Sequence, residues 1–251
     1  SLSSSANKLS ISGYNRFGSQ VEYKRCFTSS SQKEGGIGSM LDAIVAETPK
    51  KEALQYPSGR KKWSRSDIKR ASDALAAGLS DGGLKPGDTV VTLLDENDVD
   101  LHMMQFTAAK LGLQLAVLDI NNLNASSLQN VLVECQPVML LYAPFHGDTD
   151  ITKFLYEMIP ELPRHNKDCG IPFRSVQFPA LKRVVHTGFD DIKGVENMKY
   201  IFLPDLSTED AKHPCTLYQP ALTDKTPLCI NLKADGSKVD VLSHADVLSK
   251  S

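Results

Sequence analysis

The residues best suited to chemistry lie near the end of the sequence, in the stretch PLCINLKADGSKVDVLSH (residues 227–244). Gly236, Ser237 and Lys238 are the residue types of a phosphate-binding loop, in which glycine lets the backbone approach the ligand, a hydroxyl donates a hydrogen bond and lysine supplies positive charge. Asp235 places a carboxylate where phosphate oxygens would lie. The stretch therefore predicts a strand, an incomplete phosphate-binding loop and then a helix.

Other polar residues are weaker candidates for a site. The acidic run at residues 95–100 could bind a cation, but it fits a strand-to-helix turn with a helix cap and an acidic first turn better. His165 with Cys169, and His213 with Cys215, could be two halves of a zinc site, but their irregular spacing favours scattered loop residues. We therefore expect no metal site and no cofactor.

The amino-acid composition does not indicate a class of binding partner. The 251 residues include 28 Lys and Arg against 30 Asp and Glu, and 41% are hydrophobic, which is typical of a protein with no general bias toward nucleic acid or membrane. No apolar run approaches the roughly 20 residues of a spanning helix, so no transmembrane helix is expected. The five cysteines are scattered, which favours a reducing compartment. Nucleic acid is an expected partner only if the chain belongs to a ribosome.

Apolar runs and helical periods alternate along the chain. Such alternation predicts an α/β fold with a mostly parallel sheet flanked by helices. The expected helices are residues 37–48, 64–81, 98–111, 125–136, 150–162 and from 243 onward, and the expected strands are 90–94, 113–119, 138–143, 181–188, 198–205 and 227–232, with a short hairpin around residues 57–59 and a long loop at 163–179.

The first 38 residues differ from the rest. They are rich in serine and punctuated by glycine, and their basic residues outnumber Glu22 and Glu34. This composition is typical of a mitochondrial transit segment, and equally of a flexible solvated tail. We expect an extended N-terminal tail at residues 1–38 that is transit-like or acts as a tether, followed by one domain at residues 39–251.

Several sequence segments, taken in their order along the chain, resemble the N-terminal part of acyl-CoA synthetases in the adenylate-forming ligase family. The segment GLKPGDTVVTLLDENDVDLHMMQFTAAKLGLQLAVLDINNLNASSLQNVLVECQPVMLLY is similar to that family's opening, and YEMIPELP and FPALKRVVHTG are similar to medium-chain acyl-CoA synthetases. The resemblance runs from about residue 39 to the end and implies a truncated N-terminal α/β domain, under half of a complete family member.

In that family the strand is followed by T-S-G-T-T-G-x-P-K-G and then by [ST]-H, and this loop wraps the ATP phosphates. Aligned on LSH, Lys238 stands at the motif lysine, but three residues are missing and the Thr/Ser/Gly run is absent. Each lost donor removes a hydrogen bond of about 1.5–3 kcal/mol, so the resemblance implies that ATP does not bind in the family manner. The degenerate phosphate-loop positions are Lys233, Asp235, Gly236, Ser237, Lys238, Ser243 and His244.

The resemblance also implies that the family's acyl pocket, ribose-binding aspartate and catalytic lysine would lie beyond this chain. We therefore expect a non-catalytic pseudoenzyme, retained as a structural or accessory subunit of a large mitochondrial complex such as the ATP synthase, a respiratory complex or the mitochondrial ribosome. Other protein subunits would cover the surface that truncation exposes. The alternative is an acyl-CoA synthetase fragment that binds acyl-CoA or ATP, or that works with a partner chain.

Overall fold

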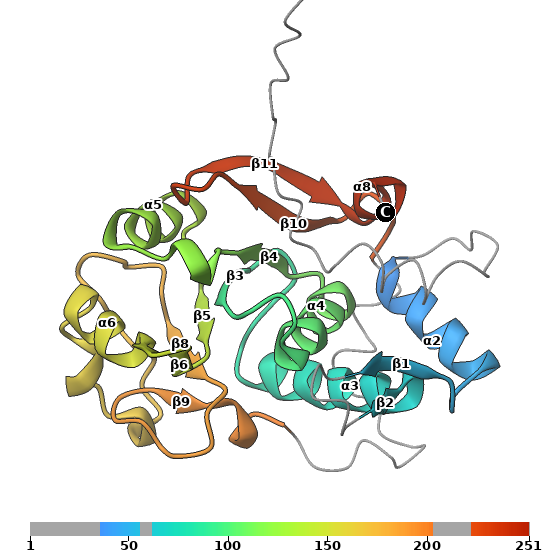
Figure 1. The fold of residues 1–251 in the computed structure, drawn as a ribbon, viewed down its shortest axis with the longest axis horizontal. Coiled ribbons are helices and arrows are strands. Elements are labelled where there is room, and N and C mark those ends of the chain that lie inside the picture. The colour runs from blue at the N-terminus through green and yellow to red at the C-terminus, as the bar shows by residue number, and fades with distance from the viewer. Residues whose placement is uncertain (1–35, 56–61, 203–221, 251) are drawn as a thin grey trace, which may run out of the picture.

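A seven-stranded sheet forms the centre of the molecule (Figure 1). The computed structural model describes residues 36–55, 62–202 and 222–250. The strand order is β11-β10-β4-β3-β5-β8-β9; neighbouring strands are parallel except β10 and β11, which are antiparallel. The strands are β3 (Thr89–Leu93), β4 (Gln114–Val117), β5 (Met139–Tyr142), β8 (Arg183–His186), β9 (Glu196–Asn197), β10 (Pro227–Leu232) and β11 (Lys238–Ser243).

The central strands are apolar because both faces of the sheet are covered. Val91 of β3 pairs with Ala116 of β4 on one side and with Leu140 of β5 on the other. Successive residues point to opposite faces, so Val90 enters one core cluster and Val91 the other. A near-continuous apolar run is the expected signature of a parallel strand buried on both faces.

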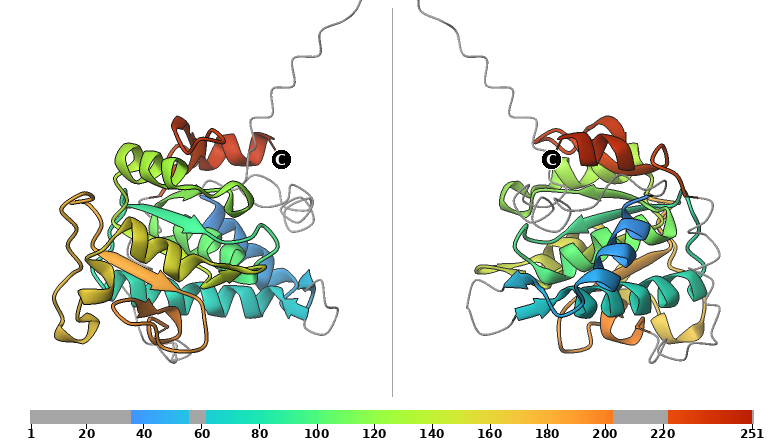
Figure 2. Two further views of the ribbon diagram at one scale, coloured as in Figure 1. Left: turned by 60° about the vertical axis from the view of Figure 1, so that its left-hand side comes forward. Right: turned by 90° about the vertical axis from the view of Figure 1, so that its right-hand side faces the viewer.

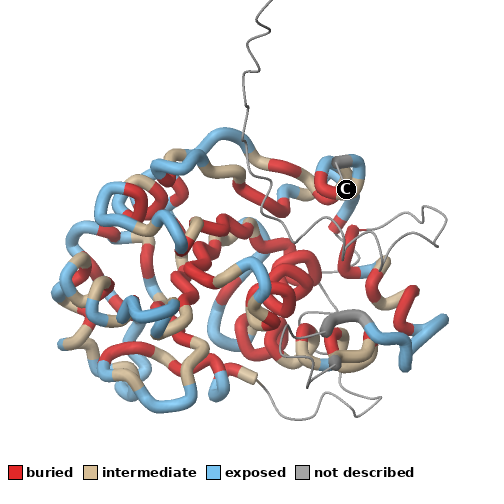
Figure 3. The backbone as a smooth tube through the Cα atoms, viewed as in Figure 1, coloured by how far each residue is buried: buried red, intermediate tan, exposed pale blue. Residues whose placement is uncertain are grey.

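Helices cover the two faces of the sheet (Figures 2 and 3). On one face lie α2 (Ile37–Glu47), α3 (Arg65–Asp81) and α4 (Val99–Leu111), and on the other lie α5 (Ala125–Cys135) and α6 (Ile151–Met158). The remaining elements are the short pairs β1 (Glu52–Gln55) with β2 (Lys62–Ser64) and β6 (Phe145–His146) with β7 (Thr149–Asp150), the 3-10 turns η1 (Ile120–Asn122), η2 (Leu162–Arg164), η3 (Lys167–Cys169) and η4 (Met198–Tyr200), and α8 (His244–Lys250).

Local sequence explains where the two longest helices begin and end. Ser64 caps α3 by accepting from the Asp67 amide, and the Asp67 carboxylate accepts from the Ser64 amide in return. Asp98 caps α4, and Gly112 ends it with φ +71°, a left-handed conformation that suits glycine. The helices expected at 64–81 and 98–111 are confirmed.

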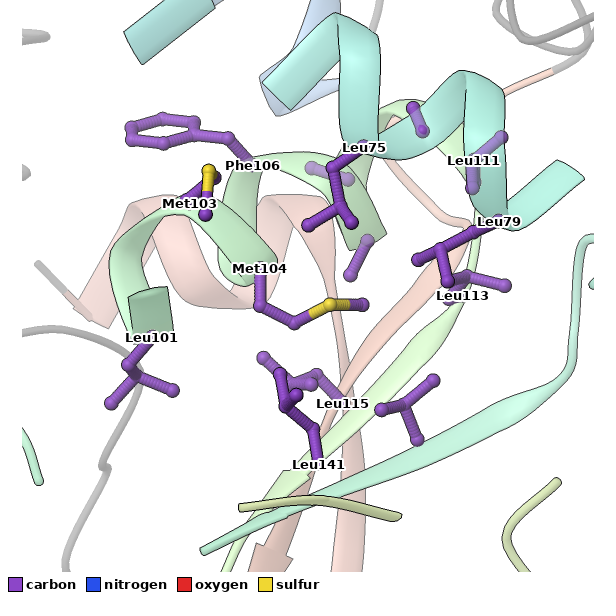
Figure 4. Close-up of a cluster of buried hydrophobic side chains, with 14 of the residues drawn as sticks. Leu75, Leu79, Leu101, Met103, Met104, Phe106, Leu111, Leu113, Leu115 and Leu141 are labelled. Carbon is purple, nitrogen blue, oxygen red and sulfur yellow. The ribbon is translucent and has the colours of Figure 1, made fainter. Parts of the chain in front are cut away.

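The larger core cluster lies between the sheet and the helices α3 and α4. Figure 4 shows Leu75 and Leu79 of α3 directed toward α4, with Met104 between the helices and the strand residues Leu115 and Leu141. All five side chains are almost fully buried. Burial of such side chains contributes roughly 1.5–3 kcal/mol each, so this cluster strongly stabilises the packing of α3 and α4 on the sheet.

A buried lysine joins the three helices of this face. Lys110 of α4 is fully buried, and its ammonium contacts the carboxylates of Asp42 in α2, at 2.9 Å, and of Asp73 in α3. Lys69, which is partly exposed, contacts the same two carboxylates. A Cβ atom at Gly38 would lie 2.9 Å from the Lys110 Cγ, so glycine allows α2 to approach this closely. The network fixes α2 against α3 and α4.

Two expectations for secondary structure are wrong. A strand was expected at residues 198–205, but the described part of this segment, residues 198–202, forms η4 and a turn, preceded by the two-residue strand β9. The Asn197 side chain accepts from the Lys199 amide and starts this turn, and the buried Met198 and Ile201 lie three residues apart, which is a helical spacing. Residues 238–243 form the strand β11, where a loop had been expected.

Parts of the sequence-based interpretation lie outside the described residues. These parts are residues 1–35 of the expected tail, the turn at 57–59, residues 203–205 of the strand expected at 198–205, and His213 with Cys215. Residues 37 and 38 begin α2. The hairpin expected around residues 57–59 agrees with the antiparallel pairing of β1 and β2 on either side.

Candidate functional site

The degenerate phosphate loop forms the tight turn of the hairpin between β10 and β11. Gly236 has φ +79°, and the Asp235 carboxylate accepts from the Ser237 hydroxyl at 2.6 Å and from the Ser237 amide at 3.0 Å. These bonds from Ser237, the hydroxyl first, lower the pKa of Asp235. Asp235 therefore stabilises the turn by accepting hydrogen bonds from Ser237. The sequence did not predict this role.

Most amides of this turn already have acceptors within the protein. The Lys233 amide donates to the Ser237 carbonyl at 2.9 Å, the Gly236 amide to the Lys233 carbonyl at 3.0 Å, and the Lys238 amide to the Glu134 carboxylate at 2.6 Å. A phosphate cradle instead needs several amides directed at the ligand. The turn thus offers an anion fewer donors than an open glycine-rich loop would.

The hairpin turn is packed against α5. The Asn130 side chain donates to the Asp235 carbonyl at 2.8 Å, and a Cβ atom at Gly236 would lie only 2.1 Å from the Ser127 carbonyl oxygen. Glycine is required here both for its positive φ and for this close approach. These contacts fix the turn on the helix.

A small cavity lies at the base of the hairpin, where β4 and β10 reach their carboxyl ends. Its volume is about 100 Å³. Ligands of open α/β sheets bind in the crevice outside the carboxyl ends of the strands, so its position suits a binding site. Polar groups come from Asp119, Asn122, Asn231 and Lys233, and apolar walls from Val117, Leu118, Cys229, Ile230, Leu232 and Ala234.

The structure divides the seven predicted positions into two groups. Lys233, Asp235, Gly236 and Ser237 lie in the turn and Lys238 begins β11, whereas Ser243 and His244 lie at the far end of that strand. At about 3.3 Å per residue, β11 separates Lys238 from Ser243 by about 16 Å. Ser243 accepts from the Asp246 amide and donates to the Asp246 carboxylate, and so caps α8. His244 is fully buried. The two groups therefore do not line one site.

The acidic run at residues 95–100 is the helix cap that its sequence favours. Asp95 accepts from the Asn97 amide, and Asp98 accepts from the Asp100 amide at the start of α4. Burial, with a smaller contribution from Asp98, raises the pKa of Asp100 to about 7. Burial also raises the pKa of Asp98.

Asp100→Asn is expected to make the protein more stable above pH 7. The folded pKa of Asp100 lies above its ordinary value of 3.8, so the folded state binds the extra proton, and the stabilisation is complete below pH 3.8 and is lost as the pH rises through 7. Asparagine carries no charge, so we expect a gain on the order of 1–2 kcal/mol at pH 8 relative to pH 4. Urea denaturation at both pH values measures this, and an equal effect at the two would contradict it.

The loop histidine and cysteine are not brought together as a zinc site. The His165 ring packs edge-on against Phe173, and the Cys169 thiol donates to the Asn166 carbonyl at 2.8 Å. Within residues 36–55, 62–202 and 222–250, no group of three or more His, Cys, Asp or Glu side chains is arranged to hold a metal ion.

Sequence reasoning missed a second cavity at the opposite edge of the sheet. It has a volume of about 490 Å³ and lies beside β8 and β9. Arg183 donates to both carboxylate oxygens of Glu196, and Lys167 lies 3.7 Å from Asp191. The charged groups come from separate loops and strands with no shared motif, so no local signal could have revealed them. The lining carries the carboxylates of Asp168, Asp191 and Glu196 against the cations of Lys167 and Arg183, so it has no excess of positive charge with which to attract a phosphate.

In the part of the chain that the structure describes, no helix combines the length and the apolar composition needed to cross a membrane.

Comparison with known proteins identifies the family. The family model described as AMP-binding enzyme matches residues 41–192. Long-chain fatty acid transport protein 6 of Mus musculus is 29% identical over 160 residues, which cover 62% of this chain and 23% of that protein. Acetoacetyl-CoA synthetase from Streptomyces lividans has a TM-score of 0.64 at 17% identity, over 86% of this chain and 31% of that one. The anthranilate CoA ligase AuaEII, in complex with anthranoyl-AMP, has a TM-score of 0.61 at 16% identity, over 85% of this chain and 36% of that one.

These findings overturn the hypothesis of a structural subunit of a mitochondrial complex. The family is one of enzymes, and the two solved structures are a synthetase and a ligase that act with CoA. They favour the alternative, a partial acyl-CoA synthetase-like enzyme, and the chain spans less than half the length of each of these relatives. Because the family model covers residues 41–192 of 251, the chain belongs to the AMP-binding enzyme family.

Proposed function

We propose that this chain is the N-terminal part of an acyl-CoA synthetase-like, adenylate-forming enzyme, and that it binds an acyl-adenylate or acyl-CoA ligand together with a further part of such an enzyme. The observation that carries the proposal is the family match over residues 41–192. The hairpin cavity supports it, because it lies at the carboxyl ends of parallel strands.

The size of this cavity argues for a further part. Pockets for drug-sized ligands have volumes of roughly 300–1,000 Å³, whereas the hairpin cavity measures about 100 Å³. It has room for one portion of a nucleotide or acyl-CoA molecule. The described residues thus form one wall of the binding site, and a second part supplies the rest.

The hairpin also indicates which ligand binds best. Four of its amides and the Asp235 carboxylate are engaged within the protein, so a triphosphate gains few donors there. A ligand with a single phosphate and an apolar acyl group loses less from this arrangement. We therefore propose that an acyl-AMP analogue binds more tightly than ATP.

Isothermal titration calorimetry of this chain with ATP, a non-hydrolysable acyl-AMP analogue and CoA tests the proposal. Because this chain supplies only one wall of the site, submillimolar binding of the analogue or of CoA, with the analogue bound more tightly than ATP, is the expected result. Lys233→Ala should weaken binding of the analogue about tenfold, since Lys233 lines the hairpin cavity and the substitution removes one charge-assisted contact. Lys153→Ala, at an exposed position on α6, is the matched control and should leave binding unchanged. If none of the three ligands binds at millimolar concentration, or if both variants bind like the unmodified chain, the proposal is wrong.

A further inference from the structure

His244 connects the two ends of the described chain. It is the first residue of α8, it is fully buried, and its Nδ1 accepts a hydrogen bond of 2.9 Å from the Ile37 amide at the start of α2. The N-cap residue of α2, Gly36, has no side chain with which to accept from the helix amides. His244 therefore caps α2 from a position 207 residues further along the chain.

The surroundings of the ring are shaped for this contact. A Cβ atom at position 36 would lie 3.0 Å from Nδ1 and 3.1 Å from Cε1, so glycine leaves room for the imidazole. Because Nδ1 accepts, the neutral ring carries its proton on Nε2. The Nε2 atom is buried and has no hydrogen-bond partner among the described residues. The contact thus depends on a neutral ring held in one tautomer.

A proton on Nδ1 would remove the acceptor and set two N–H groups against each other. It would also place a positive charge at the N-terminal end of α2, where the helix dipole is itself positive. The first turn of α2 has no acidic residue, and the Asp246 carboxylate is already engaged by Ser243. Burial lowers the pKa of His244 to about 4, and Asp224, in the segment before β10, opposes this.

We propose that His244 is an acid-sensitive clasp, which holds α2 against the corner between β11 and α8 while its imidazole is neutral and releases α2 when the imidazole is protonated. The contact is complete above about pH 6.5, the ordinary pKa of histidine, and weakens as the pH falls toward 4, because the released ring binds the proton more readily. The clasp does not depend on the proposed ligand, so the two proposals can fail separately.

Hydrogen exchange at the amides of α2, expressed as protection relative to the intrinsic rate at each pH, tests the clasp. In the unmodified chain this protection should fall about tenfold to a hundredfold between pH 7 and pH 4.5. His244→Asn keeps an acceptor oxygen near the position of Nδ1 and cannot be protonated there, so its protection should change much less over this range. His244→Phe keeps the ring but removes the acceptor, and its α2 amides should be weakly protected at both pH values.

The comparison with His244→Asn separates the clasp from other acid effects, because every other titrating group is the same in both proteins. An equal fall of protection in the unmodified chain and in His244→Asn would overturn the proposal. Full protection of α2 in His244→Phe at pH 7 would also overturn it. If His244→Phe does not fold, the comparison with His244→Asn still decides.

Discussion

Lys110→Ala is expected to lower the free energy of unfolding by about 3–5 kcal/mol. The side chain is fully buried, so the substitution leaves a cavity between α2 and α4 and removes the cation between Asp42 and Asp73. Removing one partner of a buried ion pair is costly, and here the two carboxylates would keep only Lys69, a partly exposed cation. Urea denaturation followed by circular dichroism measures the change.

Lys69→Ala is the matched control for this prediction. Lys69 contacts the same two carboxylates, but about a third of its side chain is exposed, and exposed ion pairs contribute about 0–1 kcal/mol. The control should therefore cost under about 1 kcal/mol. Equal losses for the two variants would mean that charge alone, without burial, determines the contribution of Lys110.

Gly236→Ala is expected to detach the hairpin turn from α5 at a cost of about 3 kcal/mol or more. The left-handed conformation alone costs roughly 1–2 kcal/mol for a residue with a Cβ atom. The new Cβ atom would also lie 2.1 Å from the Ser127 carbonyl, which is part of the backbone and cannot rotate away. The hydrogen bonds from Asn130 and to Glu134 should be lost with this movement. Faster hydrogen exchange at residues 233–238 and a lower urea midpoint would report both effects.

Gly170→Ala separates strain from collision. Gly170 has φ +70°, close to that of Gly236, but a Cβ atom there would meet no atom within 4 Å. This control should cost only the conformational term of about 1–2 kcal/mol and leave exchange in the hairpin unchanged. If Gly236→Ala is no more costly than Gly170→Ala, the close packing of the turn on α5 does not stabilise it.

Local patterns predicted the elements whose signals are local. The capping residues Ser64 and Asp98 and the terminating Gly112 gave the ends of α3 and α4, and apolar runs gave β3, β5 and β10. The prediction of a strand was wrong at residues 198–202, because their apolar spacing of three suits a 3-10 turn whereas their composition alone suggested a strand. The strand β11 was missed because the comparison with a loop motif outweighed the alternation in KVDVLS.

Contacts between residues that lie far apart in the sequence could not be predicted. Nothing near Lys110 signals that Asp42 and Asp73 will meet it, and nothing near His244 signals the amide of Ile37. The hypothesis of a structural subunit was wrong for a related reason. It inferred the role of the whole chain from the altered turn at residues 233–238, whereas the family match lies at residues 41–192 and does not include that turn. The transit-like tail at residues 1–38 and a mitochondrial location stay predictions.

The contact between Ile37 and His244 also constrains how the protein can be made. The first helix of the described chain completes its cap only with a residue from the last, so α2 leaves the ribosome long before its partner exists. The apolar face of α2 stays exposed while the roughly 200 residues between Ile37 and His244 are synthesised. Closing a loop of this length is a slow step in folding. We expect nascent chains that stop before residue 244 to leave α2 accessible to proteases and chaperones, and chains that include His244 to shield it.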